Sequence, residues 1–152
     1  MATRIDTSVI MRLIATQLET LSGPDVLQPG EPPSEDLVRW CRLESLSLAQ
    51  QQTVNDGADR STLSFSIRCA CRVNPEAGSV YAIAATVELV RAKFYRVGLT
   101  DQATTHQLVA TRSSVSIETD DEQPLLMLAT VAFDGEALRQ TGDTIESHSP
   151  TA

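Results

Sequence analysis

The first apolar pattern along the chain has the period of a helix. Near the N-terminus, apolar residues recur three and four positions apart and so share one face: Val9, Ile10, Leu13, Ile14, Leu18 and Leu21. Asp6 or Thr7 can cap the first turn by accepting a hydrogen bond from a free backbone N–H. Gly23 and Pro24 end the helix, because glycine adopts a left-handed turn and proline lacks an N–H.

A second helix is expected from residue 79 to residue 96. Its apolar stripe has the same helical spacing: Val80, Ile83, Ala84, Val87, Val90 and Phe94. Ser79 suits the N-cap position and Gly98 suits the C-terminal stop. Between the two helices, residues 24–35 contain four prolines, which predicts an extended connector across the surface.

Four segments have the apolar patterns of β-strands. The clearest is 61–72, in which alternate residues point to one face: Leu63, Phe65, Ile67, Cys69 and Cys71. Residues 36–48 predict a long strand whose pattern changes phase near Leu46, which indicates a bulge. The polar segment 49–60 contains Asn-Asp-Gly and predicts a turn or a long hairpin loop between these strands.

The last two strands are expected at 106–118 and 125–134, as a hairpin around the acidic sequence TDDEQP. Residues 125–128 are apolar on both faces, so this strand should be covered on both sides or lie in an interface. From Gly135 the chain is polar. At most a short helix over EALRQ, residues 136–140, is expected there, followed by a tail that only contact with a neighbour orders.

Together these elements predict one α+β domain over residues 1–134 and a polar C-terminal extension over residues 135–152. The expected order is α-β-β-α-β-β, with a four-stranded, mainly antiparallel sheet whose one face is covered by both helices. Because only 4% of the residues are aromatic, the core must be built mainly from aliphatic side chains.

The charge and the cysteine content of the chain indicate which partners it can bind and in which compartment it folds. The formal net charge of −8 disfavours nucleic acid, whose phosphates must be neutralised by Lys and Arg, and it disfavours anionic membrane surfaces. The charged N-terminus lacks the apolar core of a signal peptide, and no stretch has the length of a membrane span. Three cysteines do not suggest a disulfide framework, so the chain is expected to fold in a reducing cytoplasm.

Side chains that could support catalysis are scarce. His106 and His148 are expected on the surface, and no Gly-x-Ser-x-Gly turn is present to expose a nucleophile. Cys69 and Cys71 share a strand face and Cys41 could lie near them, but zinc needs about four ligands. Buried, unreactive thiols are therefore expected.

The acidic run at residues 120–122 has neither the alternating ligands nor the Gly bend of a calcium loop. Glycine-rich phosphate motifs are absent from the sequence. We therefore expect no enzyme activity, no cofactor and no metal.

Over roughly residues 5–134, the chain resembles a known protein family in the order of its elements, in its size and in its apolar pattern. Three segments carry this resemblance. They are IDTSVIMRLIATQLETL at the start, STLSFSIRCACR with the helix VYAIAATVELVRAKF, and VSIETDDEQPLLMLATVAF near the end. This arrangement resembles the tail terminator and tail-completion proteins of long-tailed bacteriophages.

The resemblance implies a structural virion protein of the tail or neck that is assembled in the host cytoplasm. Such proteins form a six-membered ring on the last ring of the tail tube, stop its growth and offer a surface to the head connector or adaptor. Their partners are copies of themselves, the tube protein and the connector. Their lumen is often acidic, which would suit the net charge of this chain.

Rings of this kind need two different surfaces on each subunit. The loop at 49–60, the hairpin tip at 119–124 and the tail can supply them without disturbing the core. Candidate interface residues are Asn55, Asp56, Asp59, Arg60, Asp120, Asp121, Glu122 and Arg139. Two alternatives stay open: another neck or tail component, such as a connector adaptor or tube subunit, or a small bacterial ligand-binding domain with a defined pocket.

Overall fold

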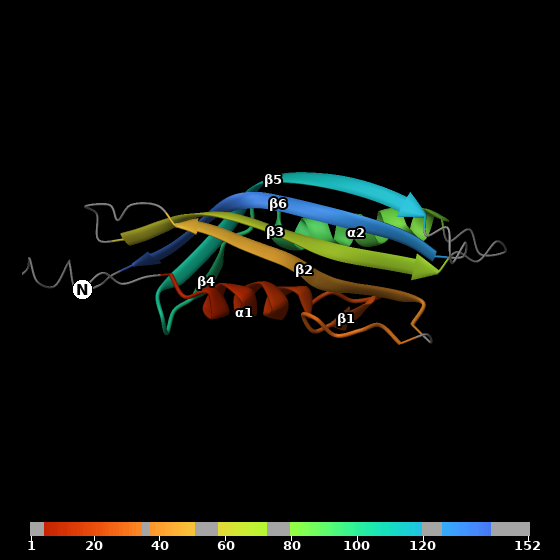
Figure 1. The fold of residues 1–152 in the computed structure, drawn as a ribbon, viewed down its shortest axis with the longest axis horizontal. Coiled ribbons are helices and arrows are strands. Elements are labelled where there is room, and N and C mark those ends of the chain that lie inside the picture. Colours follow the sequence, from red (N-terminus) through yellow and green to blue (C-terminus); the bar gives the residue numbers. More distant parts are fainter. Residues whose placement is uncertain (1–4, 35–36, 51–57, 73–79, 120–125, 141–152) are drawn as a thin grey trace, which may run out of the picture.

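The computed structural model describes residues 5–34, 37–50, 58–72, 80–119 and 126–140 (Figure 1). Within these residues, two helices and six strands follow one another: α1 (Thr7–Leu18), β1 (Asp25–Leu27), β2 (Arg39–Gln50), β3 (Ala58–Arg72), α2 (Val80–Phe94), β4 (Leu99–Asp101), β5 (His106–Thr119) and β6 (Leu126–Gln140). The strands form one sheet in the order β1-β2-β3-β6-β5-β4. β1 runs parallel to β2, and every other neighbouring pair is antiparallel.

The expected four-stranded, mainly antiparallel sheet is therefore wrong, because the sheet is mixed and has six strands. The two additional strands, β1 and β4, are three residues long. A segment of that length is too short to show a two-residue period. β1 also lies inside the proline-rich segment, for which the prediction was an extended connector across the surface.

Both helices pack on the same face of the sheet, and the sheet curls around them. α2 lies over β3 and β6, whereas α1 contacts β2 on one side and β4 and β5 on the other. Because β2 and β4 lie at opposite sides of the strand order, one helix can touch both only if the sheet is curved (Figure 1). The helices and this concave face enclose the main core.

The three phenylalanines of the chain meet in the middle of this core. Phe65 of β3 stacks on Phe133 of β6 with ring centroids 4.9 Å apart. Phe94 of α2 contacts both rings, at 5.4 and 5.5 Å. The alternation predicted for β3 is confirmed, since its inward residues from Leu63 to Cys71 are all buried.

The predicted bulge in β2 is also confirmed, because its register with β3 shifts between Leu43 and Ser45. Asp6 caps α1 as expected, since its Oδ1 accepts from the Ser8 N–H at 2.9 Å. The end of α2 differs from the prediction. The helix stops at Phe94, and the left-handed residue after it is Arg96, with φ of 59°, rather than Gly98.

A smaller apolar cluster lies on the opposite face of the sheet. Trp40 and Ala70, which are register partners, pack there with Leu27 of β1. Leu126 and Leu128 of β6 pack against the same cluster. Met127 packs against the main core, so the start of β6 makes apolar contacts on both faces although its residues are only partly buried.

β5 and β6 approach each other closely at Gly135. A Cβ atom at this position would overlap the carbonyl oxygen of Val109 and lie 2.7 Å from Ala110 Cα. β5 has a bulge between Ala110 and Arg112 at the same level, and bulges bend strands and increase their twist. β6 continues through Gly135 to Gln140, so the sheet extends beyond residue 134 and the helix expected over 136–140 is wrong.

We predict that Phe65→Ala lowers the free energy of unfolding by roughly 3–5 kcal/mol, because it removes a buried ring that contacts two others. Urea unfolding followed by circular dichroism measures this loss. Tyr81→Ala is the control, since Tyr81 is 81% exposed and its loss should change stability by no more than about 0.5 kcal/mol. Equal effects of the two substitutions would contradict the packing described here.

Gly135→Ala is expected to destabilise the protein by at least about 1–3 kcal/mol, because the added methyl group meets backbone atoms that cannot rotate away. Gly98→Ala is the matched control. A Cβ at residue 98 meets nothing within 4 Å, so that substitution should be close to neutral. The melting temperatures of both variants measure these effects. A Gly135→Ala variant as stable as the wild type would contradict the close approach of β5 and β6.

Candidate functional site

Apart from the apolar cluster around Trp40, the face of the sheet opposite the helices is largely polar over its four long strands. Side chains on this face bond to one another across the strands. The Oγ atoms of Ser45 and Ser66 join β2 to β3 at 2.6 Å. The Ser64 hydroxyl donates to Asp134 Oδ1 at 2.7 Å and so joins β3 to β6.

Arginine side chains extend this network along the same face. Arg68 donates to Thr130 on β6 and to Glu118 on β5, each at 2.9 Å. Arg60 pairs with Glu136 at 2.8 Å. Exposed pairs of this kind contribute only about 0.2–1 kcal/mol each, so they add little to the stability of the sheet.

The net negative charge of the chain does not come from this face. The strand registers place here the arginines 42, 60, 68, 72 and 112 and the acidic residues Asp25, Glu118, Asp134 and Glu136. Glu44, at the bulge of β2, pairs with Arg42. With Glu44 included, arginines and carboxylates are thus equal in number on the described part of the face, while the chain as a whole carries −8.

Two long strands have an outer edge that no described strand covers. β4 pairs with β5 only at residues 106–108, and the linker after α2 reaches no further than Ala110. β1 pairs with β2 only at residues 40–42. Within the described residues, the outer sides of 111–119 and 43–50 therefore lack a strand partner. Such rows of free N–H and C=O groups are templates for pairing with another chain.

Each free edge carries two apolar side chains on the helix-facing side. Val115 and Ile117 of β5 are 41% and 48% exposed, although their register partners Val131 and Ala129 are fully buried. On β2, Leu46 and Leu48 are only partly buried at the border of the core. The uncovered edges are thus also the places where the core is incompletely closed.

A buried histidine holds the start of α1 against the sheet. His106 is fully buried, so the expectation that it lies on the surface is wrong. Its Nε2 accepts a hydrogen bond from the Asp6 backbone N–H at 2.9 Å. Nδ1 must therefore carry the proton and donate to Thr104 Oγ1, which lies at 2.8 Å.

This environment favours the neutral imidazole. Burial, and then the positive charge of Arg139, lower the pKa of His106, while Asp6 and Asp101 oppose the shift. A second proton on the ring would point at the Asp6 N–H, where only an acceptor fits. Protonation of His106 would therefore break this hydrogen bond between the N-cap residue of α1 and β5.

The three cysteines are present as buried thiols and not as disulfides. Cys41 and Cys69 lie opposite each other in the β2–β3 register. Burial raises the pKa of both thiols to about 12. The reactive thiolate is therefore disfavoured at neutral pH. Among the described residues, no group of three or more His, Cys, Asp or Glu side chains is placed to hold a metal ion.

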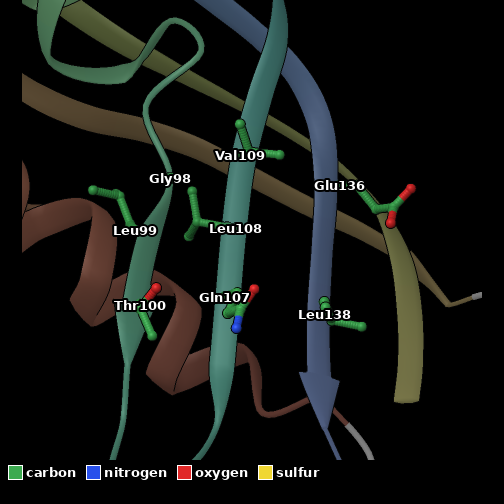
Figure 2. A pocket seen from close by; sticks show the side chains of 8 residues that line it. All are labelled: Gly98, Leu99, Thr100, Gln107, Leu108, Val109, Glu136 and Leu138. Atoms are coloured by element: carbon green, nitrogen blue, oxygen red, sulfur yellow. The ribbon is translucent and has the colours of Figure 1, made fainter. Parts of the chain in front are cut away.

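A small hollow lies where β4, β5 and β6 meet (Figure 2). Its volume is about 130 Å³, and its lining is Gly98, Leu99, Thr100, Gln107, Leu108, Val109, Glu136 and Leu138. The only ionisable group in the lining, Glu136, is already paired with Arg60. Because ligand pockets usually measure roughly 300–1,000 Å³ and hold converging polar groups, this hollow does not fit a small-molecule site.

The structure describes three of the predicted interface residues. Asp59 is only 1% exposed and lies opposite Arg139 in the β3–β6 register, so these two residues belong to the end of the sheet rather than to a loop. Arg60 lies next to them on the polar face. The other five, Asn55, Asp56, Asp120, Asp121 and Glu122, lie outside the described residues, and so does His148.

The free edges were not predicted from the sequence. Their signal was present in the alternation of Val115 and Ile117 with serines, but alternation alone shows which face is apolar and not whether a neighbour covers it. Nor did the sequence indicate that the N-terminal helix is attached through His106, since the two ends of that bond are 100 residues apart.

A solved chain from the virion of a native gene transfer agent particle has a similar fold. The TM-score is 0.58, the match covers 85% of this chain and 94% of that chain, and sequence identity is 15%. This chain shares its fold with a virion protein. Searches of protein families and of curated proteins found no match. No helix among the described residues is long and apolar enough to cross a membrane.

We predict that acid destabilises the protein through His106. Because folding lowers the pKa of His106 below its ordinary value of 6.5, its contribution is present above pH 6.5 and is lost as the pH falls towards the lowered pKa. In that window the free energy of unfolding should fall by up to about 1.4 kcal/mol per pH unit for this one proton.

Urea unfolding of the wild type and of His106→Gln over a series of pH values tests this prediction. The variant keeps the other titrating groups, including His148, and should show a smaller slope between pH 6.5 and the lowered pKa. Parallel curves for the two proteins would mean that His106 does not titrate in this way.

Proposed function

We propose that this chain is a structural subunit of a phage-like virion and acts as a tail terminator. In this role it forms a ring, six-membered in the family it resembles, on the last ring of the tail tube. The ring stops growth of the tube and presents a surface to the head connector or adaptor. Assembly takes place in the host cytoplasm, and the finished ring lies in the tail or neck.

The observation that carries the proposal is the match to a chain of the gene transfer agent virion, which spans nearly the whole of both chains. A match of that extent means that the two proteins share an architecture rather than one local motif. The sequence layout resembles tail terminator and tail-completion proteins independently of this match. Both lines of argument favour a protein that works by assembly.

The distribution of polar and apolar groups supports the same role. A closed ring needs two different surfaces that meet head to tail, and the two free strand edges of β2 and β5 are different from each other. Several of the described ionisable groups make structural contacts across the sheet, such as Arg68 with Glu118 and Arg60 with Glu136. We therefore propose that the protein is not an enzyme.

Electron microscopy of tail tubes provides the decisive test. Purified protein is mixed with tubes assembled from the tube protein of the same virus, and negative-stain images are scored for density at the tube ends. We expect rings on one end only. Size measurement over a range of concentrations should show whether the free protein is a monomer that forms rings at high concentration or on the tube.

Each other result in the same images has a different meaning. Protein bound along the tube sides, or not bound at all, would remove the terminator role. Stacking of the protein into long filaments would instead assign it as a tube subunit, because a terminator must stop after one ring. Binding to the isolated connector but not to the tube would assign it as a connector adaptor.

A further inference from the structure

The two free strand edges fit each other. We propose that the outer edge of β5, residues 111–119, pairs with the outer edge of β2, residues 43–50, of a second copy of this chain. One continuous sheet would then cross each subunit boundary. This inference deepens the proposed function, since it names the contact that builds the ring.

Strand directions support this pairing. β2, β3, β6 and β5 are neighbours in the sheet, and each runs antiparallel to the next. Three reversals separate β2 from β5, so these two strands run in opposite directions. When a second copy is rotated about an axis along the strands, its β2 lies antiparallel to β5 of the first copy. The alternation of strand direction then continues from one subunit into the next without interruption.

The positions of the apolar side chains also support the pairing of β5 with β2 of a second copy. Val115 and Ile117 of β5 and Leu46 and Leu48 of β2 all lie on the helix-facing side of their strands. An antiparallel register with Val115 opposite Leu48 and Ile117 opposite Leu46 joins these pairs into one apolar row. The same register places Ser116 opposite Ser47 on the polar face. All apolar groups left uncovered at the two edges would be buried in one step.

The composition of both edges suits pairing rather than protection. Edge strands that must stay single usually carry lysine, proline or inward-pointing charges. Residues 111–119 and 43–50 contain no lysine and no proline. Their charged residues are Arg112, Glu118 and Glu44, and Glu118 and Glu44 are each paired with an arginine of their own chain.

A head-to-tail contact explains both edges at once. A two-fold contact between two β5 strands would satisfy residues 111–119 but leave residues 43–50 of both copies without a partner. Head-to-tail pairing uses one edge of each kind at every boundary. Rotation from copy to copy then closes a ring.

Engineered cysteines test the contact directly. Ser116→Cys and Ser47→Cys are placed on exposed positions of the polar face, where directly opposite residues lie within reach of a disulfide. The natural thiols should not interfere, because they are buried and the pKa values of Cys41 and Cys69 are raised to about 12. The full-length double variant is oxidised, or treated with a short thiol cross-linker, after assembly on tail tubes or at high concentration.

We expect the double variant to give a ladder of covalent oligomers that ends at the ring size, and neither single variant to give more than traces of dimer. Ser116→Cys combined with Ala85→Cys is the matched control, because Ala85 is exposed on α2 and outside both edges. Efficient dimers from Ser116→Cys alone would overturn the proposal in favour of the two-fold contact. Absence of the ladder in samples that do contain rings would also overturn it.

A second pair of variants tests the apolar row. Ile117→Lys should abolish ring formation without unfolding the monomer, because Ile117 is already 48% exposed. Val38→Lys, at a position 59% exposed and just before β2, should assemble like the wild type. Normal rings from Ile117→Lys would contradict the pairing.

Failure of this inference can be told apart from failure of the proposed function. Rings that cross-link as expected but do not cap tubes would leave the edge contact intact and remove the terminator role. Capping of tubes by Ile117→Lys, without cross-links in the double cysteine variant, would keep the terminator role and remove the edge contact.

Discussion

Packing of both helices on one face of the sheet is the constraint on which the rest of the structure depends. The contact of Phe65, Phe94 and Phe133 joins two central strands to α2 and so fixes which side of the sheet is the core. Because side chains alternate along a strand, every second residue then lies on the face of the sheet opposite the helices. No helix within the described residues buries that second face, which explains its serines, threonines and ion pairs.

The same constraint explains how much of the fold could be predicted from the sequence. The type and place of long periodic segments such as β3 and the two helices were predicted correctly, though not all of their ends, because burial on one side leaves a strong pattern in the residues. β1 and β4 were not predicted, because a strand of three residues is too short to show a two-residue period. These strands pair only because the neighbouring strands are already in place. The last strand was predicted to end before Gly135, because a glycine followed by polar residues is typical of a strand end. Here the glycine instead permits the close approach of β5 to β6.

The candidate assembly site was harder to predict than the fold. Among the residues chosen for their charge, Asp59 turned out to be buried beside the end of the sheet. The free edges depend instead on where β1 and β4 stop, which is a property of the assembled sheet and not of any local sequence. His106 shows the same limitation, because its role depends on a backbone group 100 residues away.

Gly135 also offers a way to recognise distant relatives. At 15% identity, overall sequence comparison says little about which positions two chains have in common. The clash at residue 135 involves only main-chain atoms of the neighbouring strand, so no change in surrounding side chains can relieve it. A glycine in the last strand, aligned with a bulge in the strand before it, is therefore a geometric signature that should persist after most of the sequence has diverged. It could guide structure-based alignment where residue identities no longer can.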